Sequence, residues 1–262
     1  MKNNLMVKLR NWLKSIPILS KSLSFIKSKI KPDKSSVSYW IGKFVSNRVI
    51  QVLQIGSNDG ISGDTLNKLI KENKQWQVLF VEPVPDLFKK LRQNYGSSER
   101  FKFENAGINV DGSQQKFYKI GEDAFKEIPA LSENYKQIGS FSREHVEKLS
   151  TTEIIKFIEQ LDVNCMSLGK LLEKHKIETL DLVQIDAEGY DWKILSQLDL
   201  SKHRPEMIIF ENKNLKEGEK EEAIKFLQET YYIFSMRQDY MCIRRDKLKR
   251  SDMGVLLSRL AN

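Results

Sequence analysis

Residues 50–60 read I-Q-V-L-Q-I-G-S-N-D-G, an apolar strand that runs into a loop with two glycines. A helical pattern follows near 62–73, so the loop joins a strand to a helix. Glycine adopts positive φ readily, and its missing Cβ lets backbone N–H groups approach a ligand. We expect this loop to cradle a small polar or anionic group, and a plain tight turn is the alternative. Its candidate binding residues are Gly56, Ser57, Asn58 and Gly60.

Apolar strands and helical stretches alternate along the rest of the chain. The further strand-like runs lie at 77–81, 101–106, 180–185 and 206–210, and the helical stretches lie near 85–95, 167–175, 190–198 and 217–229. Strands separated by helices predict a parallel sheet with right-handed crossovers. Residues 231–245 alternate like an antiparallel hairpin. The predicted fold is α/β, a doubly wound and mostly parallel sheet with a C-terminal antiparallel hairpin.

The same alternation predicts the domain organisation. The α/β pattern covers residues 37–250, with a basic arm and linker at 1–36 before it and a C-terminal tail at 251–262 after it. Residues 120–160 fit the alternation poorly. Sheets of this kind bind their ligands beyond the carboxyl ends of the strands. We therefore expect 120–160 to be an insertion on the substrate side of that edge.

The second strand ends in V-E-P-V-P, which puts Glu82 at its carboxyl end, 22 residues after the second glycine of the loop. An acid at this point accepts the hydroxyls of a ribose in nucleoside-binding folds, and Pro83 follows it. The third strand ends in E-N-A-G-I, so Asn105 and Ala106 reach the same edge and would border an adenine. Asn58 replaces the middle glycine of the dinucleotide fingerprint, which disfavours an NAD-dependent oxidoreductase.

The fourth strand ends in Q-I-D-A-E-G-Y-D at 184–191 and brings Asp186 directly to the sheet edge. The amino-acid end of a cofactor and the substrate would meet there, so Asp186 is a candidate for cofactor binding and for catalysis. Glu188 is a candidate substrate-binding residue. Two carboxylates at this spacing also permit a divalent ion, and capping of the next helix is the plain alternative. We assign no metal site.

Three segments resemble the FkbM family of S-adenosylmethionine-dependent methyltransferases: V-L-Q-I-G-S-N-D-G at 52–60, V-E-P at 81–83 and D-L-V-Q-I-D-A-E-G-Y-D at 181–191. The resemblance implies a class I, Rossmann-like domain and S-adenosylmethionine as the cofactor. It also implies O-methylation of a hydroxyl on a sugar, a glycan or a polyketide-type metabolite. Gln54 stands where many members of the family carry an acid.

Methyl transfer to a neutral hydroxyl needs alignment of the reacting groups and removal of a proton. Asp186 is the first candidate for the base because of its position. His145, in the predicted insertion, is the second candidate, and a surface helix residue is its alternative. Arg143 is a candidate substrate-binding residue of the same segment. The alternative function is a non-catalytic Rossmann-like binding or scaffold module that is tethered by the arm.

The net charge of +8 resides in the arm. Of the 43 basic and 35 acidic residues, residues 1–34 hold nine and one, which leaves 34 of each sign in the rest of the chain. A neutral body argues against a nucleic-acid partner, because backbone phosphates need a basic face. We expect a small-molecule or glycan acceptor.

The arm places apolar residues at helical spacing among its lysines, and these are Leu5, Leu9, Trp12, Leu13 and Ile16. A basic amphipathic helix either contacts an anionic membrane or packs its apolar face on the domain. Lys14 and Lys21 interrupt the apolar stretch, so we expect no signal peptide. Two cysteines form no disulfide framework. The expected location is the cytoplasm, with peripheral contact at the inner membrane surface if the arm binds lipid.

Overall fold

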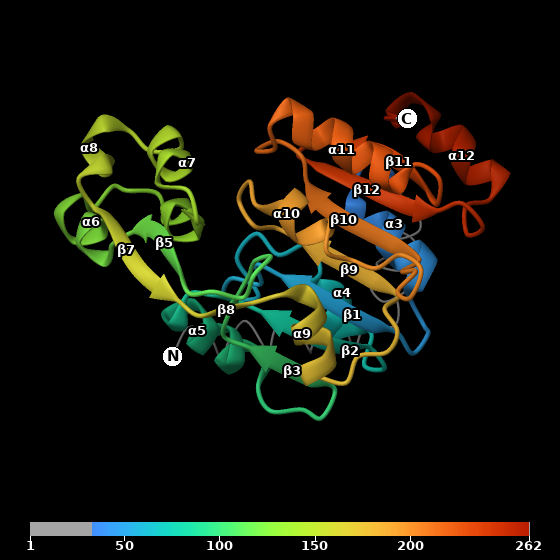
Figure 1. Ribbon diagram of the computed structural model, residues 1–262, viewed down its shortest axis with the longest axis horizontal. Helices are drawn as coiled ribbons and strands as arrows, with labels where there is room; N and C mark the ends of the chain where they lie inside the picture. The colour runs from blue at the N-terminus through green and yellow to red at the C-terminus, as the bar shows by residue number, and fades with distance from the viewer. Residues whose placement is uncertain (1–32, 262) are drawn as a thin grey trace, which may run out of the picture.

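The computed structural model describes residues 33–261 (Figure 1). The predicted amphipathic helix of the arm lies outside the described residues. Within 33–261 the main sheet has seven strands in the order β11-β12-β10-β9-β1-β2-β3. Their bounds are β1 (Gln51–Ile55), β2 (Gln77–Val81), β3 (Phe101–Glu104), β9 (Leu182–Ile185), β10 (Met207–Glu211), β11 (Tyr231–Met236) and β12 (Asp239–Arg244).

The central strands are parallel, and the hairpin closes one edge. Strand β1 pairs in parallel with β2 and β9, while β12 runs antiparallel to β10 and β11. All four residues of β9 are buried, as expected of a strand with helices on both faces. The predicted doubly wound, mostly parallel sheet with a C-terminal hairpin is confirmed.

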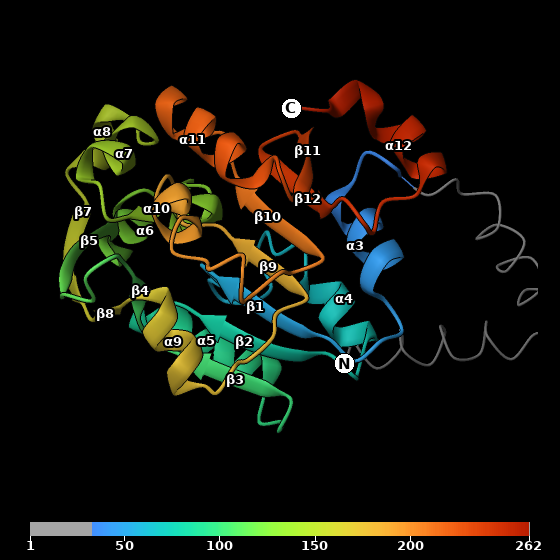
Figure 2. The ribbon, with the colours of Figure 1, turned by 45° about the vertical axis from the view of Figure 1, so that its right-hand side comes forward.

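Two layers of helices cover the sheet (Figures 1 and 2). One face packs against α9 (Leu168–Lys174), α10 (Asp191–Leu195) and α11 (Glu217–Leu227). The other face packs against α3 (Val37–Val45), α4 (Asn67–Glu72), α5 (Pro85–Tyr95) and α12 (Arg250–Leu256). Trp40 of α3 and Leu53 of β1 are fully buried, one in the apolar cluster on each face of the sheet, and burial of a large apolar side chain stabilises the fold by about 2–3 kcal/mol.

Residues 251–261, expected as a tail, pack against the sheet instead. Helix α12 and the 3-10 turn η2 (Leu257–Arg259) lead to Leu260, which forms a β-bridge with Phe234. Leu256 is fully buried, and Asp252 forms an ion pair with Lys43 of α3. The apolar positions of this short segment have no complete helical pattern of their own, so only the sheet beneath them indicates that they are buried.

A separate lobe, residues 115–163, contains the stretch 120–160 that fits the strand–helix alternation poorly. Its antiparallel sheet has the order β6-β5-β7. Its elements are β5 (Gln115–Ile120), α6 (Glu122–Glu127), η1 (Glu133–Gln137), β6 (Gly139–Ser140), α7 (Arg143–Lys148), α8 (Thr152–Ile155) and β7 (Ile158–Val163). The short strands β4 (Gly107–Ile108) and β8 (Cys165–Met166) pair at its base. Both views place the lobe beside the carboxyl ends of the parallel strands (Figures 1 and 2).

Candidate functional site

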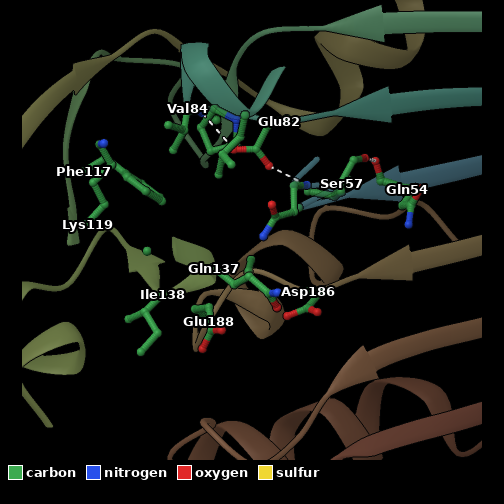
Figure 3. Close-up of a pocket in the computed structure, with 18 of the residues that line it drawn as sticks. Gln54, Ser57, Glu82, Val84, Phe117, Lys119, Gln137, Ile138, Asp186 and Glu188 are labelled. Atoms are coloured by element: carbon green, nitrogen blue, oxygen red, sulfur yellow. Dashed lines mark hydrogen bonds between the residues drawn. The ribbon is translucent and has the colours of Figure 1, made fainter. Parts of the chain in front are cut away.

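A pocket lies between the lobe and the carboxyl edge of the sheet. We call the sheet side the rim, defined as residues 54–64, 82–87, 106–108 and 184–188. In Figure 3, Glu82 and Asp186 lie on opposite sides of the loop that carries Ser57, and Phe117, Lys119 and Ile138 of the lobe face them. The edge where the strand ends meet is thus the wall of the pocket, as this class of sheet predicts.

The glycine loop after β1 fixes the strand ends against one another. Gly56 has φ +76°, and a Cβ on it would lie 1.8 Å from the carbonyl oxygen of Asp186. The backbone N–H groups of Gly56 and Ser57 both donate to the carbonyl of Val81, at 3.0 Å. Gly56, Ser57 and Asn58 line the pocket, so three of the four residues predicted for this loop lie at the site.

Gly60, the fourth, does not line the pocket. It has φ +73°, and a Cβ on it would lie 2.6 Å from Leu91 and from Tyr95, both on α5. Gly60 therefore allows the loop to pack closely on a helix. The sequence could not separate the two cases, because a ligand and a helix exclude a Cβ in the same way.

Glu82 is 4% exposed and lines the pocket. Its two carboxylate oxygens accept hydrogen bonds from the backbone N–H groups of Asn58 at 2.8 Å and Val84 at 2.9 Å. Burial raises the pKa of Glu82 to about 7 in spite of these two bonds. Each oxygen keeps an acceptor site for a further donor, such as a hydroxyl.

Asn105 and Ala106 follow β3 and differ in their environment. Ala106 is buried and lines the pocket, together with Pro83. Asn105 is exposed and does not line the pocket, because its side-chain amide donates to the carbonyls of Glu82 at 2.8 Å and Pro83 at 3.2 Å. Asn105 therefore holds the backbone on which Glu82 is presented.

Asp186 begins the loop after β9, and its N–H donates to the carbonyl of Ile55 at 3.0 Å. Its side chain contacts solvent inside the pocket and forms no hydrogen bond or ion pair with any residue of 33–261. The surrounding protein raises the pKa of Asp186 to about 7 by desolvation, and the charge of Glu188 adds to this effect. This carboxylate is an available acceptor for a proton.

Glu188 lines the pocket in a left-handed conformation, with φ +46°. Its Oε2 lies 3.3 Å from Nε2 of His145 and accepts a hydrogen bond from Asn214 at 3.0 Å. His145 belongs to α7 of the lobe and does not line the pocket. Its position beside Glu188 makes it a residue that orients a carboxylate rather than one that faces the pocket.

Arg143 does not line the pocket either. Its Nε contacts Oε1 of Glu147 at 2.8 Å on the same helix, and half of the side chain is exposed. The pair spans one helical turn, which is the usual arrangement of a surface ion pair. The expected contact between Arg143 and a substrate therefore finds no support in the position of its side chain.

Sequence reasoning missed several residues of the pocket. Asp64, which precedes α4, lines it, and its sequence signal is the same as that of an ordinary helix cap. Besides Phe141, the lobe contributes Phe117, Lys119, Lys136, Gln137, Ile138 and Gly139. No local pattern marks these six, since only the position of the lobe brings them to the rim. Within residues 33–261, no group of three or more His, Cys, Asp or Glu side chains is arranged to hold a metal ion.

Comparisons with solved structures return methyltransferases of low identity. The N-terminal domain of human METTL16 is 12% identical, with 78% of this chain and 66% of that chain covered and a TM-score of 0.41. TrmK of M. capricolum, in complex with S-adenosyl-homocysteine, is 13% identical, with coverages of 83% and 73% and a TM-score of 0.37. The plantazolicin methyltransferase BamL is 9% identical, with coverages of 94% and 81% and a TM-score of 0.36. Values this low leave the family assignment to the sequence of the domain.

A search of curated proteins finds no match. The model of the methyltransferase FkbM domain matches residues 54–236, which contain the glycine loop, Glu82, Asp186 and the whole lobe. The cofactor is accordingly S-adenosylmethionine. The chain belongs to the FkbM family of S-adenosylmethionine-dependent methyltransferases.

Proposed function

We propose that this methyltransferase transfers the methyl group to a hydroxyl of a sugar, a glycan or a related metabolite. The observation that carries the proposal is the carboxylate of Asp186. It lines the pocket, has no partner among residues 33–261, and has a pKa raised to about 7 because the surrounding protein desolvates it. A general base is most effective when its pKa is close to the working pH.

The residues of the rim fit the cofactor. Gly56 leaves no space for a Cβ, so the backbone of 56–58 can approach a ligand closely. Glu82 would hold the ribose hydroxyls, and Ala106 would border the adenine. When bound, S-adenosylmethionine supplies an electrophilic methyl group on a sulfonium.

The acceptor would lie between Asp186 and the lobe. Asp186 takes the proton from the acceptor hydroxyl at a carboxylate oxygen. Glu188 has one oxygen occupied by His145 and Asn214, and its Oε1 has no hydrogen-bond partner among the described residues, so it can accept a second hydroxyl. Phe117 and Phe141, with ring centroids 5.3 Å apart, supply an apolar wall. Positioning and proton removal are what this reaction requires of the protein.

The test uses Asp186→Asn with labelled S-adenosylmethionine and a panel of free sugars, oligosaccharides and hydroxylated polyketides. If Asp186 is the base, turnover falls by about 10²–10⁴-fold while adenosylhomocysteine still binds. In the wild type, kcat/KM rises with pH and reaches a plateau above about pH 7, because the base must lose its proton. Normal turnover of the variant, or a product methylated on nitrogen, sulfur or carbon, would contradict the proposal.

We also propose that the arm brings the enzyme to anionic membranes, which would suit a lipid-linked glycan. The support is compositional, namely nine basic residues in 1–34 beside a neutral remainder. Each Lys or Arg near an anionic surface contributes about 1 kcal/mol. Within the part of the chain that the structure describes, no helix has the length and apolar character to cross a bilayer.

Liposome sedimentation tests this second proposal. The full chain should sediment with phosphatidylglycerol vesicles at low salt, and the bound fraction should fall as salt shortens the screening length. Removal of 1–34 should abolish sedimentation and leave cofactor binding intact. A full-length protein that ignores such vesicles at low salt would contradict it.

A further inference from the structure

Three polar side chains gather at the end of the pocket beside β1 and β9. Gln54 and Gln184 occupy paired positions on the two strands and are 2% and 9% exposed. Asp64 reaches the same point from the loop before α4. All three line the pocket. Because these side chains are buried or half-buried, the balance of hydrogen-bond donors and acceptors among them determines which ligand group can bind there. An unmatched buried polar atom costs free energy.

The cluster has more acceptors than donors. Oδ1 of Asp64 accepts from the side-chain amide of Gln54 at 2.9 Å and from the N–H of Leu66 at 2.7 Å. Oδ2 accepts a long bond, 3.4 Å, from the hydroxyl of Tyr95, and the backbone N–H of Asn67 also donates to this carboxylate. Oε1 of Gln54 is buried and has no partner among the described residues. Oε1 of Gln184 accepts only from Gln54, at 3.5 Å.

The charge of the cluster is also uncompensated. No Lys, Arg or His of residues 33–261 forms an ion pair with Asp64. Burial raises the pKa of Asp64, so its ionised form carries a desolvation cost that a cation would offset. A ligand that matches this end of the pocket needs a positive charge and several N–H donors. A primary ammonium group has both, with three donors and no acceptor.

The strand order gives the direction in which the cofactor extends. Glu82 ends β2, whereas Gln54 and Gln184 lie on β1 and β9, on the other side of the glycine loop. A nucleoside whose ribose is held at Glu82 therefore directs its remaining part along the edge toward Asp64. In S-adenosylmethionine, that part ends in an α-amino acid.

We propose that Asp64, held in place by the amide of Gln54, binds the α-ammonium group of the cofactor. The proposal rests on the function proposed above only through the shared cofactor. Gln54 carries no charge, so the negative charge comes from a residue ten positions later, and the two side chains act as a pair. One carboxylate within the pair should be sufficient, whichever of the two positions carries it.

Calorimetry on the full-length protein tests the pair with two ligands. Adenosylhomocysteine carries the ammonium, and 5′-methylthioadenosine keeps the nucleoside but lacks the amino acid. Asp64→Asn should bind adenosylhomocysteine about 10- to 100-fold more weakly, as expected for loss of a charge-assisted bond, with unchanged affinity for methylthioadenosine. The exchanged pair, Gln54→Glu with Asp64→Asn, should recover most of the affinity for adenosylhomocysteine.

Asp111→Asn is the matched control. Asp111 accepts from the N–H two residues later, Ser113, at 2.9 Å, as Asp64 does from Leu66, but it lies outside the pocket. Its variant should bind both ligands as the wild type does. Three results with the variants would overturn the inference: unchanged affinity of Asp64→Asn for adenosylhomocysteine, an equal loss for both ligands, or no recovery in the exchanged pair.

These outcomes are separate from those of the proposed function. If Asp64→Asn does not fold, the exchanged pair alone still decides, because it keeps one carboxylate and one amide at the same point. A wild type that binds neither ligand would contradict the proposed function. A wild type that binds both ligands with equal affinity would contradict only the ammonium site.

Discussion

The rim and the lobe face each other across one pocket, yet two carboxylates of the rim are unpaired among the described residues, whereas the lysines of the lobe that line the pocket form ion pairs. On the rim, Glu82 and Asp186 are carboxylates without a cationic partner in the described chain, and desolvation by the surrounding protein raises the pKa of both. On the lobe, Lys119 and Lys136 each contact a glutamate of the lobe, at 3.6 and 2.8 Å. Charge that is left unmatched inside a protein is costly, whereas ion pairs that reach the solvent, as these two do through their glutamates, cost and contribute little.

The difference assigns different tasks to the two walls. The rim is built on a sheet with helices on both faces, so it can hold costly polar groups in fixed positions for a charged cofactor. The lobe has a small core of its own, centred on Ile120, Ala124, Val146 and Ile154. Its contribution to the pocket is mainly shape, which suits selection of the acceptor.

The largest effect should come from Gly56→Ala, which breaks the rim itself. The new Cβ would meet the carbonyl of Asp186, and the φ of +76° is strained for alanine. We expect the free energy of unfolding to fall by about 3–5 kcal/mol and adenosylhomocysteine binding to be lost. Gly169→Ala is the control, because nothing lies within 4 Å of its Cβ on α9. If Gly56→Ala still bound adenosylhomocysteine, the close contact between Gly56 and the carbonyl of Asp186 would not be needed to hold the strand ends together.

The next largest effect should be the pH dependence of stability, because the carboxylates with raised pKa values lie on the sheet side of the molecule and not on the lobe. The pKa of Glu82 is raised from 4.5 to about 7, and those of Asp186, Glu211 and Asp239 are also raised, so the folded state binds protons more tightly than the unfolded state. Their contribution is full below the unfolded values and is lost as pH rises through 6–8. His203, whose pKa burial lowers, acts in the opposite direction.

We therefore expect the ligand-free protein to lose at least about 2–3 kcal/mol of stability between about pH 5 and pH 8. Denaturant unfolding at a series of pH values measures this change. Saturating adenosylhomocysteine should make the free energy of unfolding fall less steeply with pH if the ligand binds to these carboxylates. A flat profile would remove the electrostatic contrast between rim and lobe.

Glu82→Gln sharpens the comparison within the rim. Glutamine offers one acceptor to two backbone N–H groups, those of Asn58 and Val84, and carries no charge. Adenosylhomocysteine and methylthioadenosine should both bind about 10- to 100-fold more weakly, because the ribose is common to them. A loss confined to adenosylhomocysteine would place Glu82 at the amino-acid end instead.

Ser140→Ala tests the contact between the two walls. The Ser140 hydroxyl donates to the carbonyl of Glu188 at 3.0 Å and so connects the lobe to the loop of Asp186. Stability should fall by about 1 kcal/mol, and the KM for the acceptor should rise while cofactor affinity is kept. Ser150→Ala removes a similar bond, to Val146 within the lobe, and should lower stability without a change in KM. An identical KM in both variants would contradict a role of the lobe in acceptor binding.

The smallest effect belongs to Arg143→Ala. Its pair with Glu147 is exposed, so the loss of stability should be below about 0.5 kcal/mol. Turnover and KM should stay unchanged, as in the control Lys148→Ala, which removes the neighbouring pair with Glu144. A rise in KM in Arg143→Ala alone would revive its expected role in substrate binding.

Much of the rim was predictable because its residues are marked by the ends of strands. Glu82, Ala106 and Asp186 follow apolar runs that form β2, β3 and β9, and all three line the pocket. Asn105 follows β3 and Gly60 closes the glycine loop, yet both face protein, Asn105 toward backbone carbonyls and Gly60 toward α5. Sequence position fixes which edge a residue reaches, whereas the direction of its side chain depends on neighbours that are distant in the chain.

The sequence alone determined the alternation of strands and helices along the main sheet, the glycine loop and the carboxylates at the strand ends. It could do so because these depend on local periodicity and on the rule that parallel strands end at one edge. Only the tertiary structure decided that Asp64 joins Gln54, that His145 meets Glu188, and that Arg143 faces away from the pocket. The positions of His145 and Arg143 depend on how the lobe closes through the pairing of β5 with β7, some 40 residues apart. The contact of Asp64 with Gln54 depends on burial, which no short stretch of sequence encodes.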